Sequence, residues 1–452
     1  MACHMIDSML FSDNYLTPQM KAIWDDEAII ANWLEAEVAL AQSQAKLGII
    51  KQDIADEIAK KAKVENLDIA AIRKEINRVG HSLVPTIREL EKICDGEAGQ
   101  FVHLGATTQD IIDMGFIIAA KKAFDVIYQD VYEIEGILID LAEKHRKTIM
   151  TGRSHTQHAL PITFGYKVAV WASEMHRNLE RMRECRSRDF AGQLSGAVGS
   201  MASFGEHAFE LHDMVMEQLQ LSAPDICWHV SRDRILSIGS ILALLAGTIG
   251  KIGNEILNMQ KTELSEVAEP WAQGNVGSST MPHKRNPNAS EAMVSLNRLV
   301  RGNWMQLQDA MMQEHERDGA AWKVEWVALP EAFIFTAAAV AKAKKVLGGL
   351  VVNKENMEKN LNILKGLLLS EAVMLHLGEV MGKQTAHEVV YEISMEAFKD
   401  DAEFKDYLLA DERISKHITA KELDEVLNPH NYTGHCAEIT DRVVAKIRNT
   451  RK

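Results

Sequence analysis

The feature that most constrains the fold is a set of long segments in which apolar residues recur at helical spacing. In residues 232–264, Ile241, Leu245, Ile249 and Ile252 return every three or four positions, as the buried face of a helix requires. Segments of this length lie near or above the upper end for globular helices. They predict a long bundle, and long bundles often pair with copies of themselves. Further long helices are expected over 113–147, from Pro161 towards Arg188, over 288–315 and over 330–350.

The rest of the chain favours the same fold class. Residues with high helix propensity, among them Ala, Leu, Met, Glu and Lys, dominate the composition, and only nine prolines occur. No strand alternation is strong enough to predict a sheet. A length of 452 residues exceeds what one hydrophobic core supports. We therefore expect an all-α chain of three domains: an N-terminal helical domain over 1–112, a central long-helix bundle over 113–362 and a small helical C-terminal domain over 363–452.

Charge and cysteine content limit the partners and the compartment. The net charge of −14 disfavours nucleic acid as a partner, and it requires any anion site to be a local cluster of Lys, Arg and backbone N–H groups. The cysteines are odd in number, widely spaced and without a CxxC pair. This pattern indicates reduced thiols in a cytoplasmic protein, without a disulfide framework or a zinc site. They are Cys3, Cys94, Cys185, Cys227 and Cys436.

Neither membrane insertion nor export is expected. The two longest uncharged runs, 190–205 and 235–250, are shorter than the ~20 residues that a membrane-spanning helix needs. The second run contains several Gly, Ser and Thr residues, and we interpret it as a helix buried among other helices. The N-terminal residues lack the basic start and apolar core of a signal peptide.

Three polar loops interrupt the helical patterns, and the first covers 103–110. Gly105 frees the backbone, while Thr107 and Thr108 present adjacent hydroxyl and N–H groups. A turn of this kind before a helix holds a carboxylate well, because the helix dipole helps. The alternative is a capping loop in which Thr107 or Thr108 caps the helix and Asp110 lies in its first turn. From the loop alone, the cap is favoured.

The second loop, 151–165, brings Arg153, His155, Gln157 and His158 close together in sequence. Histidine is the side chain best suited to proton transfer near neutral pH. Arg153 either fixes a carboxylate or pairs with an acidic side chain. No third ligand follows nearby, so a metal bound by His155 and His158 is not expected.

The third loop, 273–287, combines glycines with hydroxyl, cationic and amide side chains. Gly274 and Gly277 make its first part mobile, and Lys284 and Asn286 direct charge and donors to one place. This pattern predicts a flexible lid followed by a rigid anion-binding segment. A phosphate loop is excluded because Gly-Lys-Ser/Thr is absent, and a plain solvated loop is the weaker alternative. The hydroxyls belong to Ser278 and Ser279, and the stiffening prolines are Pro282 and Pro287.

A last polar segment, 315–326, is ambiguous. It begins His315-Glu316-Arg317 and either lines a pocket or contributes to the core. Trp322 and Trp326 have the i, i+4 spacing of one helix face. Trp326 is expected in the core, while Trp322 fits either interpretation.

The three loops closely resemble three motifs of the aspartase/fumarase superfamily. Residues 277–287, GSSTMPHKRNP, are similar to its signature GSSxMPxKxNP. Residues 152–159 resemble GRTHxQxA, with Ser154 in place of Thr, and residues 103–110 resemble HxGxTSxD, with Thr108 in place of Ser. The motifs occur in the family's order and spacing, and the similarity spans nearly the whole chain.

This resemblance implies a three-domain, mainly helical fold in which the central helices of four subunits form one twenty-helix core. Each active site of the homotetramer then takes its three loops from three different chains. The implied substrate is a small anionic carboxylate, and neither a cofactor nor a metal is implied. Ser278 is the expected general base and His155 the expected general acid or its partner. The residues expected to bind substrate are His81, Thr107, Thr108, Arg153, Gln157, Ser279, Lys284 and Asn286.

The chemistry that the resemblance implies is removal of a carbon-bound proton beside a carboxylate, followed by anti elimination, or the reverse reaction. Its dianionic aci-carboxylate intermediate requires stabilisation, which Lys284, Asn286 and loop N–H groups are expected to supply. Serine is a weak base in water. Ser278 therefore needs a closed, water-poor site with positive charge nearby.

Within the superfamily, the chain resembles the branch that contains adenylosuccinate lyase and 3-carboxy-cis,cis-muconate cycloisomerase. His283 and Arg285 replace the Gly and Val of the MPGKVNP sequence of fumarase and aspartase, and residues 315–331 resemble the cycloisomerase stretch HERxxxxWxxEWxxLPE. His81 and His158 depart from the cycloisomerase pattern. Cycloisomerase-like chemistry is therefore placed first and another fumarate-releasing lyase, acting on an N-substituted aspartate, second. Adenylosuccinate lyase is third, and an inactive structural homologue is the remaining alternative.

Overall fold

The computed structural model describes residues 4–271, 274 and 280–451. Contacts within the chain divide it into two compact units. Unit 1 consists of Met1–Val131, Asn178–Gly250 and Ala292–Ala341. Unit 2 consists of Tyr132–Arg177, Lys251–Glu291 and Lys342–Lys452. The division into domains over 1–112, 113–362 and 363–452 stays a prediction.

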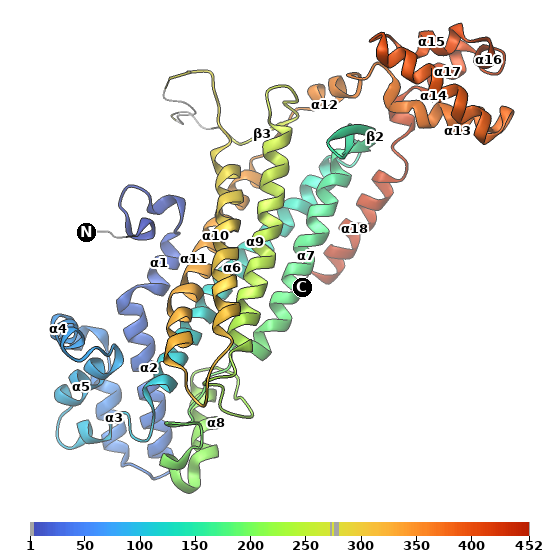
Figure 1. The fold of residues 1–452 in the computed structure, drawn as a ribbon. Coiled ribbons are helices and arrows are strands. Elements are labelled where there is room, and N and C mark those ends of the chain that lie inside the picture. The colour runs from blue at the N-terminus through green and yellow to red at the C-terminus, as the bar shows by residue number, and fades with distance from the viewer. Residues whose placement is uncertain (1–3, 272–273, 275–279, 452) are drawn as a thin grey trace. The chain divides into compact units, whose positions relative to one another are not determined.

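Five long helices dominate the structure (Figure 1), so the predicted all-α class is confirmed. Each contains a buried apolar face of the kind that its sequence periodicity predicted. The assembly of such helices into a four-chain core stays a prediction. The five are α6 (Thr108–Lys144), α7 (Phe164–Asp189), α9 (Asp233–Met259), α10 (Asn288–Ala310) and α11 (Gly319–Gly348).

One predicted helix start was wrong for a clear physical reason. Helix α11 begins at Gly319 instead of Pro330, which lies inside the helix. Proline removes only one N–H donor, and the helix is capped before it by Asp318, whose carboxylate accepts from the N–H groups of Ala320 and Ala321 at 2.8 and 3.2 Å. The predicted end of α10 was also too late, since the helix stops at Ala310.

Small residues let α9 and α10 pack closely in unit 1. A side chain at Gly239 would meet Leu307, and one at Gly250 would meet Asn297. Because Gly239 faces the end of α10 and Gly250 faces its middle, the two helices run antiparallel. Gly239 and Gly250, two of the glycines that interrupt the most apolar run of the sequence, therefore serve helix packing.

The remaining elements of unit 1 are shorter helices. Thr17 caps a helix that opens at Pro18, and Gly80 ends another with φ of 69°. One helix, α2, covers the whole segment from Asp26 to Lys46. These helices are α1 (Pro18–Trp24), α2 (Asp26–Lys46), α3 (Gln52–Lys61), α4 (Ile69–Val79), α5 (Leu83–Ile93) and α8 (Ala208–Gln218), with 3-10 turns η1 (Met5–Asp7), η2 (Ser12–Asn14), η3 (Val64–Asn66), η4 (Ala98–Phe101) and η5 (Ala202–His207).

Unit 2 contains short strands that the sequence did not predict. Strands β1 (Ile149–Ser154) and β2 (Gln157–Thr163) form an antiparallel hairpin. Strands β3 (Val267–Ala268) and β4 (Val351–Val352) form a second pair. Pro161, the expected start of a helix, pairs with Thr151 within the hairpin, and α7 begins only at Phe164. A lone hairpin is too short to give a clear alternation, which is why the helical interpretation failed.

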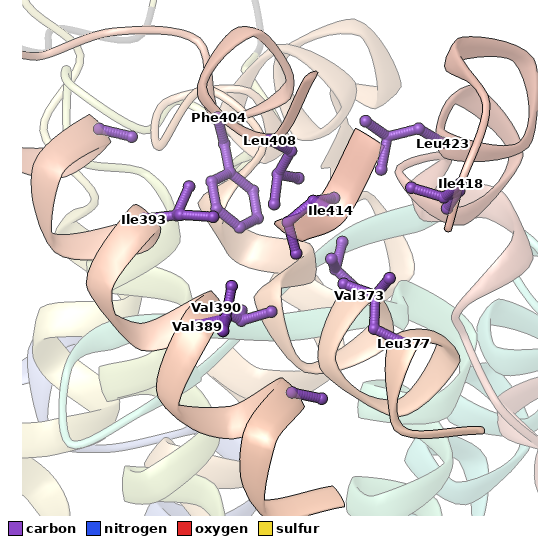
Figure 2. Close-up of a cluster of buried hydrophobic side chains, with 12 residues drawn as sticks. Val373, Leu377, Val389, Val390, Ile393, Phe404, Leu408, Ile414, Ile418 and Leu423 are labelled. Carbon is purple, nitrogen blue, oxygen red and sulfur yellow. The ribbon is translucent and has the colours of Figure 1, made fainter. Parts of the chain in front are cut away.

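The C-terminal part of unit 2 is a group of short helices with its own core. Figure 2 shows this core, in which Val390, Ile393, Phe404 and Leu408 are among the buried side chains. The helices that build this core are α13 (Ser370–Met381), α14 (Lys383–Lys399), α15 (Phe404–Ala410), α16 (Glu412–Ser415) and α17 (Ala420–Val426). The other elements of this part of the chain are α12 (Lys354–Leu361) and α18 (Cys436–Thr450), with 3-10 turns η6 (Leu367–Leu369) and η7 (Pro429–Asn431).

Two helices, α9 and α11, are long and apolar enough to cross a membrane by length and composition alone. In their most apolar windows, 61% and 67% of the residues are buried inside the protein. The expectation that the run 235–250 forms a helix packed among others is therefore confirmed.

Candidate active site

The three polar loops fall in different parts of the chain. Loop 103–110 belongs to unit 1, whereas loop 151–165 and the described residues of loop 273–287 belong to unit 2. Ser278 and Ser279, the expected base and its neighbour, lie outside the described residues. The other predicted site residues are all described.

Loop 103–110 caps α6 by a carboxylate and leaves a threonine hydroxyl for another role. The N–H group of Thr107 donates to Oδ2 of Asp110 at 3.1 Å, and Thr108 is the first residue of α6. The hydroxyl of Thr107 instead accepts from Nη1 of Arg317 at 2.8 Å. Asp110 thus lies in the first turn of the helix, as expected, but the hydroxyl of Thr107 joins a polar cluster instead of capping the helix.

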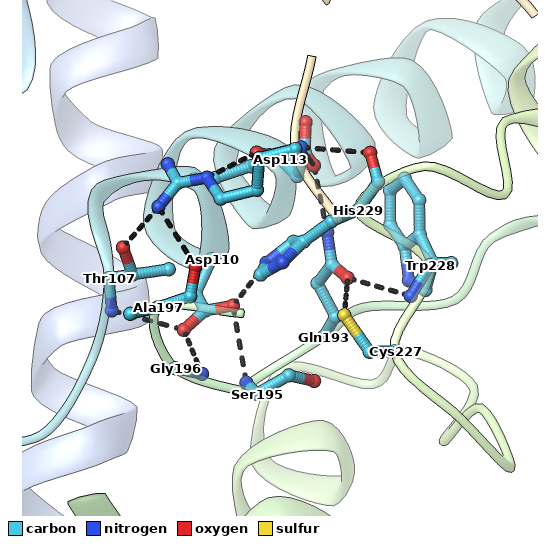
Figure 3. A network of polar contacts seen from close by, with 12 residues as sticks. Thr107, Asp110, Asp113, Gln193, Ser195, Gly196, Ala197, Cys227, Trp228 and His229 are labelled. Carbon is cyan, nitrogen blue, oxygen red and sulfur yellow. Dashed lines mark hydrogen bonds and ion pairs between the residues drawn. The ribbon is translucent and has the colours of Figure 1, made fainter. Parts of the chain in front are cut away.

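Asp110 is a fully buried carboxylate at the centre of this region (Figure 3). Besides Thr107, it accepts hydrogen bonds from the N–H groups of Ser195 at 3.2 Å and Gly196 at 3.0 Å. Its Oδ1 also lies 2.9 Å from Nε2 of His229, a residue that is 1% exposed. Burial lowers the pKa of His229, but the interactions with Asp110 and Cys227 outweigh it and raise this pKa to about 9. A buried ion pair between Asp110 and His229 therefore stabilises loop 103–110.

A second buried carboxylate lies one helical turn further along α6. Both oxygens of Asp113 accept from Arg232, at 2.8 and 3.1 Å, and Arg232 also pairs with Glu325. The indole N–H of Trp322 donates to Asp113 at 2.9 Å. Trp322 is thus a core residue with a polar partner, and its ring packs edge-on against that of Trp326, with centroids 4.8 Å apart.

Arg317 brings positive charge to the start of α6, a role that the sequence did not assign to it individually. Besides Thr107, its guanidinium donates to Oε1 of Gln109 at 3.0 Å and to the carbonyl of Ala197 at 3.4 Å. Burial and the charge of Arg317 both lower the pKa of His81, which places His81 in the same electrostatic neighbourhood. Arg317, Thr107 and His81 therefore form a cluster suited to an anion.

In unit 2, the hairpin presents His155 at a strained turn. Ser154 pairs with Gln157, so His155 and Thr156 form a two-residue turn with φ of 49° and 68°. Positive φ at both positions is the type I′ geometry, which normally selects Asn and Gly, and it is unfavourable for a β-branched residue such as Thr156. His155, Thr156 and Gln157 are all exposed. Such strain at an exposed histidine is typical of a functional position.

Arg153 anchors the hairpin from its buried side. Its guanidinium donates to both oxygens of Glu266, at 2.9 and 2.6 Å. Glu266 is fully buried and also accepts from the amide of Asn360 at 2.9 Å. Arg153 thus has the acidic partner that the sequence offered as an alternative, and its substrate-binding role stays a prediction. Burial and the charge of Arg153 lower the pKa of His158.

The rigid end of the third loop is anchored at the start of α10. The carboxylate of Glu269 accepts from the N–H groups of Ser290 at 2.6 Å and Ala289 at 3.3 Å, which are the orphan donors of that helix. Lys284 is exposed and Asn286 is half-buried. An anion that meets this loop therefore meets Lys284, because Glu269 already occupies the helix terminus.

The structure brings Thr107, Thr108 and His81 into one unit, together with Arg317. It places Arg153, His155, Gln157, Lys284 and Asn286 in the other unit. Among the residues that the structure describes, no hydrogen bond or ion pair joins the hairpin turn to Lys284 or Asn286. Their roles as one site stay predictions.

Comparison with known proteins identifies the family. A lyase family model matches residues 13–302, and a model of the adenylosuccinate lyase C-terminus matches residues 366–443. The chain is 43% identical to N-acetyl-S-(2-succino)cysteine lyase from Dickeya dadantii, over 98% of both chains. It is 38% identical to adenylosuccinate lyase from Methanocaldococcus jannaschii, over 99% of this chain and 97% of the relative.

A solved structure agrees with these sequence matches. The 3-carboxy-cis,cis-muconate lactonizing enzyme from Pseudomonas putida superimposes with a TM-score of 0.93 at 32% identity, covering 98% of this chain and all of that one. The chain belongs to the aspartase/fumarase superfamily, in the branch of adenylosuccinate lyase and 3-carboxy-cis,cis-muconate cycloisomerase, and it is an enzyme of the lyase or intramolecular lyase type.

Proposed function

We propose that this enzyme cleaves a substituted succinate by β-elimination and releases fumarate, and that the bond it breaks joins carbon to sulfur. The observation that carries this proposal is the 43% identity, over 98% of both chains, to an N-acetyl-S-(2-succino)cysteine lyase. The name of that relative specifies a thioether of succinate. Loss of the thiol from such a substrate leaves a carbon–carbon double bond between two carboxylates, which is fumarate.

Two cationic loops suit a substrate with two carboxylates. Arg317 lies beside the hydroxyl of Thr107 at the start of α6, and its five donors match a carboxylate. Lys284 is exposed after the third loop and offers a second cation. We assign one carboxylate of the succinyl group to each of these loops, which different chains of the proposed tetramer supply, with Thr108, Asn286, Ser279 and Gln157 as further substrate contacts.

Ser278 is the proposed base and acts on the carbon next to one carboxylate. Removal of this proton places negative charge on the carboxylate oxygens, so the cation that holds them binds the transition state more tightly than the ground state. The electrons then form the double bond as the sulfur leaves. A serine acts as a base only where water is excluded, so the proposal requires a water-poor site around the substrate.

The leaving group decides how much His155 contributes. A thiol has a pKa of about 8.5, so a thiolate leaves without full protonation, whereas an amine must be protonated as it leaves. The strained turn presents the imidazole of His155 outward, where it is available as the acid. We therefore expect the rate of thioether cleavage to depend less on His155 than the rate of amine release.

A homotetramer with sites shared between chains is part of the proposal. Apolar side chains are exposed along three of the long helices: Leu244 is 51% exposed, Met305 64% and Val327 54%. Exposed apolar positions on long helices favour association with further helices. If the sites are shared, mixed tetramers of Ser278→Ala and His155→Gln chains recover activity above that of either variant alone. No recovery in mixtures of proven mixed composition would contradict shared sites.

A cycloisomerase is the second candidate. The structural match to the Pseudomonas putida lactonizing enzyme, with a TM-score of 0.93, and the sequence of residues 315–331 favour it. The two chemistries share proton removal beside a carboxylate but differ in the leaving atom, which is carboxylate oxygen in one case and sulfur in the other. A direct test of substrates separates them.

The decisive experiment follows fumarate by its ultraviolet absorbance with four substrates. They are N-acetyl-S-(2-succino)cysteine, adenylosuccinate, an N-alkyl aspartate and 3-carboxy-cis,cis-muconate, whose own absorbance reports its cyclisation. We expect the thioether to give the highest kcat/KM. Preference for the muconate would instead establish the cycloisomerase, and no turnover of any of them by a normal tetramer would indicate an inactive homologue.

Ser278→Ala tests the base, with Ser279→Ala as the matched control. Loss of a general base lowers kcat by roughly 10²–10⁴, whereas loss of a substrate contact raises KM more than it lowers kcat. Ser278→Ala is therefore expected to show the larger loss in kcat. Equal kcat values for Ser278→Ala and the wild type would assign proton removal to another group.

A further inference from the structure

Cys227 lies beside the buried junction of unit 1, in a setting that the proposed elimination does not use. It is one of four free thiols among the described residues, with Cys94, Cys185 and Cys436. Of these, Cys185 and Cys436 are buried, whereas Cys94 and Cys227 are half-buried. Cys227 follows Ile226, which is 71% exposed, so the thiol lies at the border between core and solvent.

The groups around Cys227 are those of an activated thiol. Figure 3 shows its sulfur beside Gln193, whose Oε1 accepts a hydrogen bond from the thiol at 3.7 Å, and the thiol also interacts electrostatically with His229. His229 bonds Asp110 through Nε2, which leaves Nδ1 for the sulfur side of the ring. Cys227, His229 and Asp110 thus follow the order of nucleophile, base and orienting carboxylate.

Two buried polar atoms next to this thiol lack another partner. Nδ1 of His229 and the hydroxyl oxygen of Ser195 have no hydrogen-bond partner of standard geometry among the described residues, although both residues are 1% exposed. Both interact with Cys227. Unpaired buried polar groups are costly, so their convergence on one sulfur indicates a site that serves more than packing.

The electrostatic effect on the thiol agrees with this geometry. Burial raises the pKa of Cys227, but its interactions with His229 and Ser195 outweigh burial, and the resulting pKa lies below the ordinary value. Cys94 provides an internal contrast, because burial and the nearby carboxylate of Glu57 raise its pKa to about 11. Gly199 keeps space at the sulfur, since a side chain there would approach Sγ to 2.8 Å.

We propose that Cys227 is a covalent modification site for electron-poor alkenes that carry carboxylates, fumarate above all, and that modification there loosens the Asp110 junction and lowers turnover. The Sγ lone pair forms a bond to one alkene carbon, and the π electrons move to the other carbon. That carbon takes the proton of the His229 imidazolium, so nothing leaves and no oxidant is needed. The identification of fumarate as the enzyme's own product rests on the proposed function, but the reactivity of the thiol does not.

The consequence for the site follows from the charges. Transfer of the proton leaves His229 neutral until it takes a proton from solvent, and its pKa is then lower because the Cys227 thiolate no longer raises it. The ion pair between His229 and the buried carboxylate of Asp110 is therefore weaker after modification. Asp110 is also the group that holds the N–H of Thr107 at the start of loop 103–110. An adduct at Cys227 therefore weakens the support of a loop to which we assign substrate binding, and a product that accumulates slows its own formation.

The test measures labelling without any need for turnover. The purified full-length protein is incubated with fumarate, with uncharged dimethyl fumarate and with succinate, and each cysteine is followed by peptide mass spectrometry. We expect Cys227 to gain the mass of one alkene at least about tenfold faster than Cys94 with both alkenes, and no gain with succinate. Equal rates at Cys94 and Cys227, or no adduct at Cys227, would overturn the proposal even if the enzyme is shown to be a lyase.

Two variants test the mechanism and its effect. His229→Gln, checked for folding by its thermal unfolding midpoint, is expected to slow labelling of Cys227 by about tenfold while Cys94 reacts unchanged. In the wild type, activity is expected to fall in proportion to the fraction of Cys227 that carries the adduct. If no substrate is found, the thermal unfolding midpoint is measured instead and is expected to fall in the same way. Cys227→Ser is expected to keep its activity and its unfolding midpoint after the same treatment. A fully labelled wild type with unchanged activity and unchanged midpoint would refute the loosening of the junction.

Discussion

Each unit supports one candidate loop with a fully buried carboxylate, but the partners of the two carboxylates differ. In unit 1, Asp110 is held by three backbone N–H groups and by His229. In unit 2, Glu266 is held by the guanidinium of Arg153, through two hydrogen bonds, and by the amide of Asn360. Both arrangements satisfy a buried charge, as they must, since an unpaired one is very costly.

The difference lies in whether the balancing charge is permanent. Arginine keeps its charge at every pH at which proteins are studied, so the support of the hairpin is constant. Histidine titrates, and the pKa of His229, raised to about 9, places the loss of its charge within the experimental range. The loop of unit 1 is therefore supported conditionally, and the hairpin of unit 2 is not.

The largest expected effect is loss of the constant support. Arg153→Met leaves the carboxylate of Glu266, which is 0% exposed, with Asn360 as its remaining partner. Breaking a buried ion pair by removal of one partner costs about 3–5 kcal/mol. We expect the free energy of unfolding, measured by chemical denaturation, to fall by this amount.

The exposed pair between Arg448 and Glu143 is the matched control within the same unit. Its nitrogen and oxygen lie 2.9 Å apart, but the two side chains are 47% and 51% exposed. Such pairs contribute about 0–1 kcal/mol, so Arg448→Met is expected to be nearly neutral. If both variants cost the same, burial is not what makes the Arg153 pair important.

The second effect sharpens the comparison through pH. Because the folded pKa of His229 lies above its ordinary value of 6.5, the ion pair stabilises the folded state fully below pH 6.5, and this contribution is lost as the pH rises towards about 9. The thiol of Cys227, whose pKa is lowered, acts in the opposite direction. In Cys227→Ser the thiol no longer raises the pKa of His229, but Asp110 still does. We therefore expect a loss on the order of 1–2 kcal/mol between pH 6.5 and 9 in this variant, measured by denaturation at successive pH values.

The double variant with His229→Gln and Cys227→Ser is the control for this dependence of the free energy of unfolding on pH. It removes the titrating group while keeping a side chain that donates to Asp110. Its free energy of unfolding is expected to vary less between pH 6.5 and 9 than that of Cys227→Ser alone. The same slope in both proteins would show that another group titrates, and the distinction between the two supports would fail.

The helices were predictable because their cause is local and repeated. Apolar periodicity predicted every long helix. The errors concern where helices begin and end. Helix α11 begins before Pro330 because Asp318 caps it earlier, α10 ends at Ala310, and Pro161 lies in a strand of the hairpin instead of starting a helix.

The supports of the candidate site were not predictable, because their partners are far apart in sequence. Asp110 was predicted only to lie in the first turn of its helix, and no residue near it in sequence indicates that it pairs with His229, which lies 119 positions later. Arg317 is 210 positions from Thr107. Sequence motifs identify the residues of the loops, but the donors to a buried carboxylate come from segments that are distant in sequence and meet only in the folded protein.

The smallest expected effect concerns a histidine at the base of the hairpin, and its sign is opposite to that of His229. His145 lies against Phe164, where strand β2 leads into α7, and its Nδ1 is 3.1 Å from the hydroxyl of Thr148. Burial, and the charges of Lys354 and Lys144, lower its pKa to about 4. The neutral ring therefore stabilises the folded state above pH 6.5, and this contribution, on the order of 1–2 kcal/mol, is lost as the pH falls towards 4.

His145→Phe keeps a ring against Phe164 but does not titrate, so its free energy of unfolding should fall less steeply than the wild-type value over the same acid range. If the free energies of unfolding of the two proteins fell equally over this range, His145 would not carry the dependence. If the wild type instead lost stability relative to His145→Phe as the pH rises from 4 to 6.5, the effect would have the sign expected for His229, and the contrast between the two units would fail.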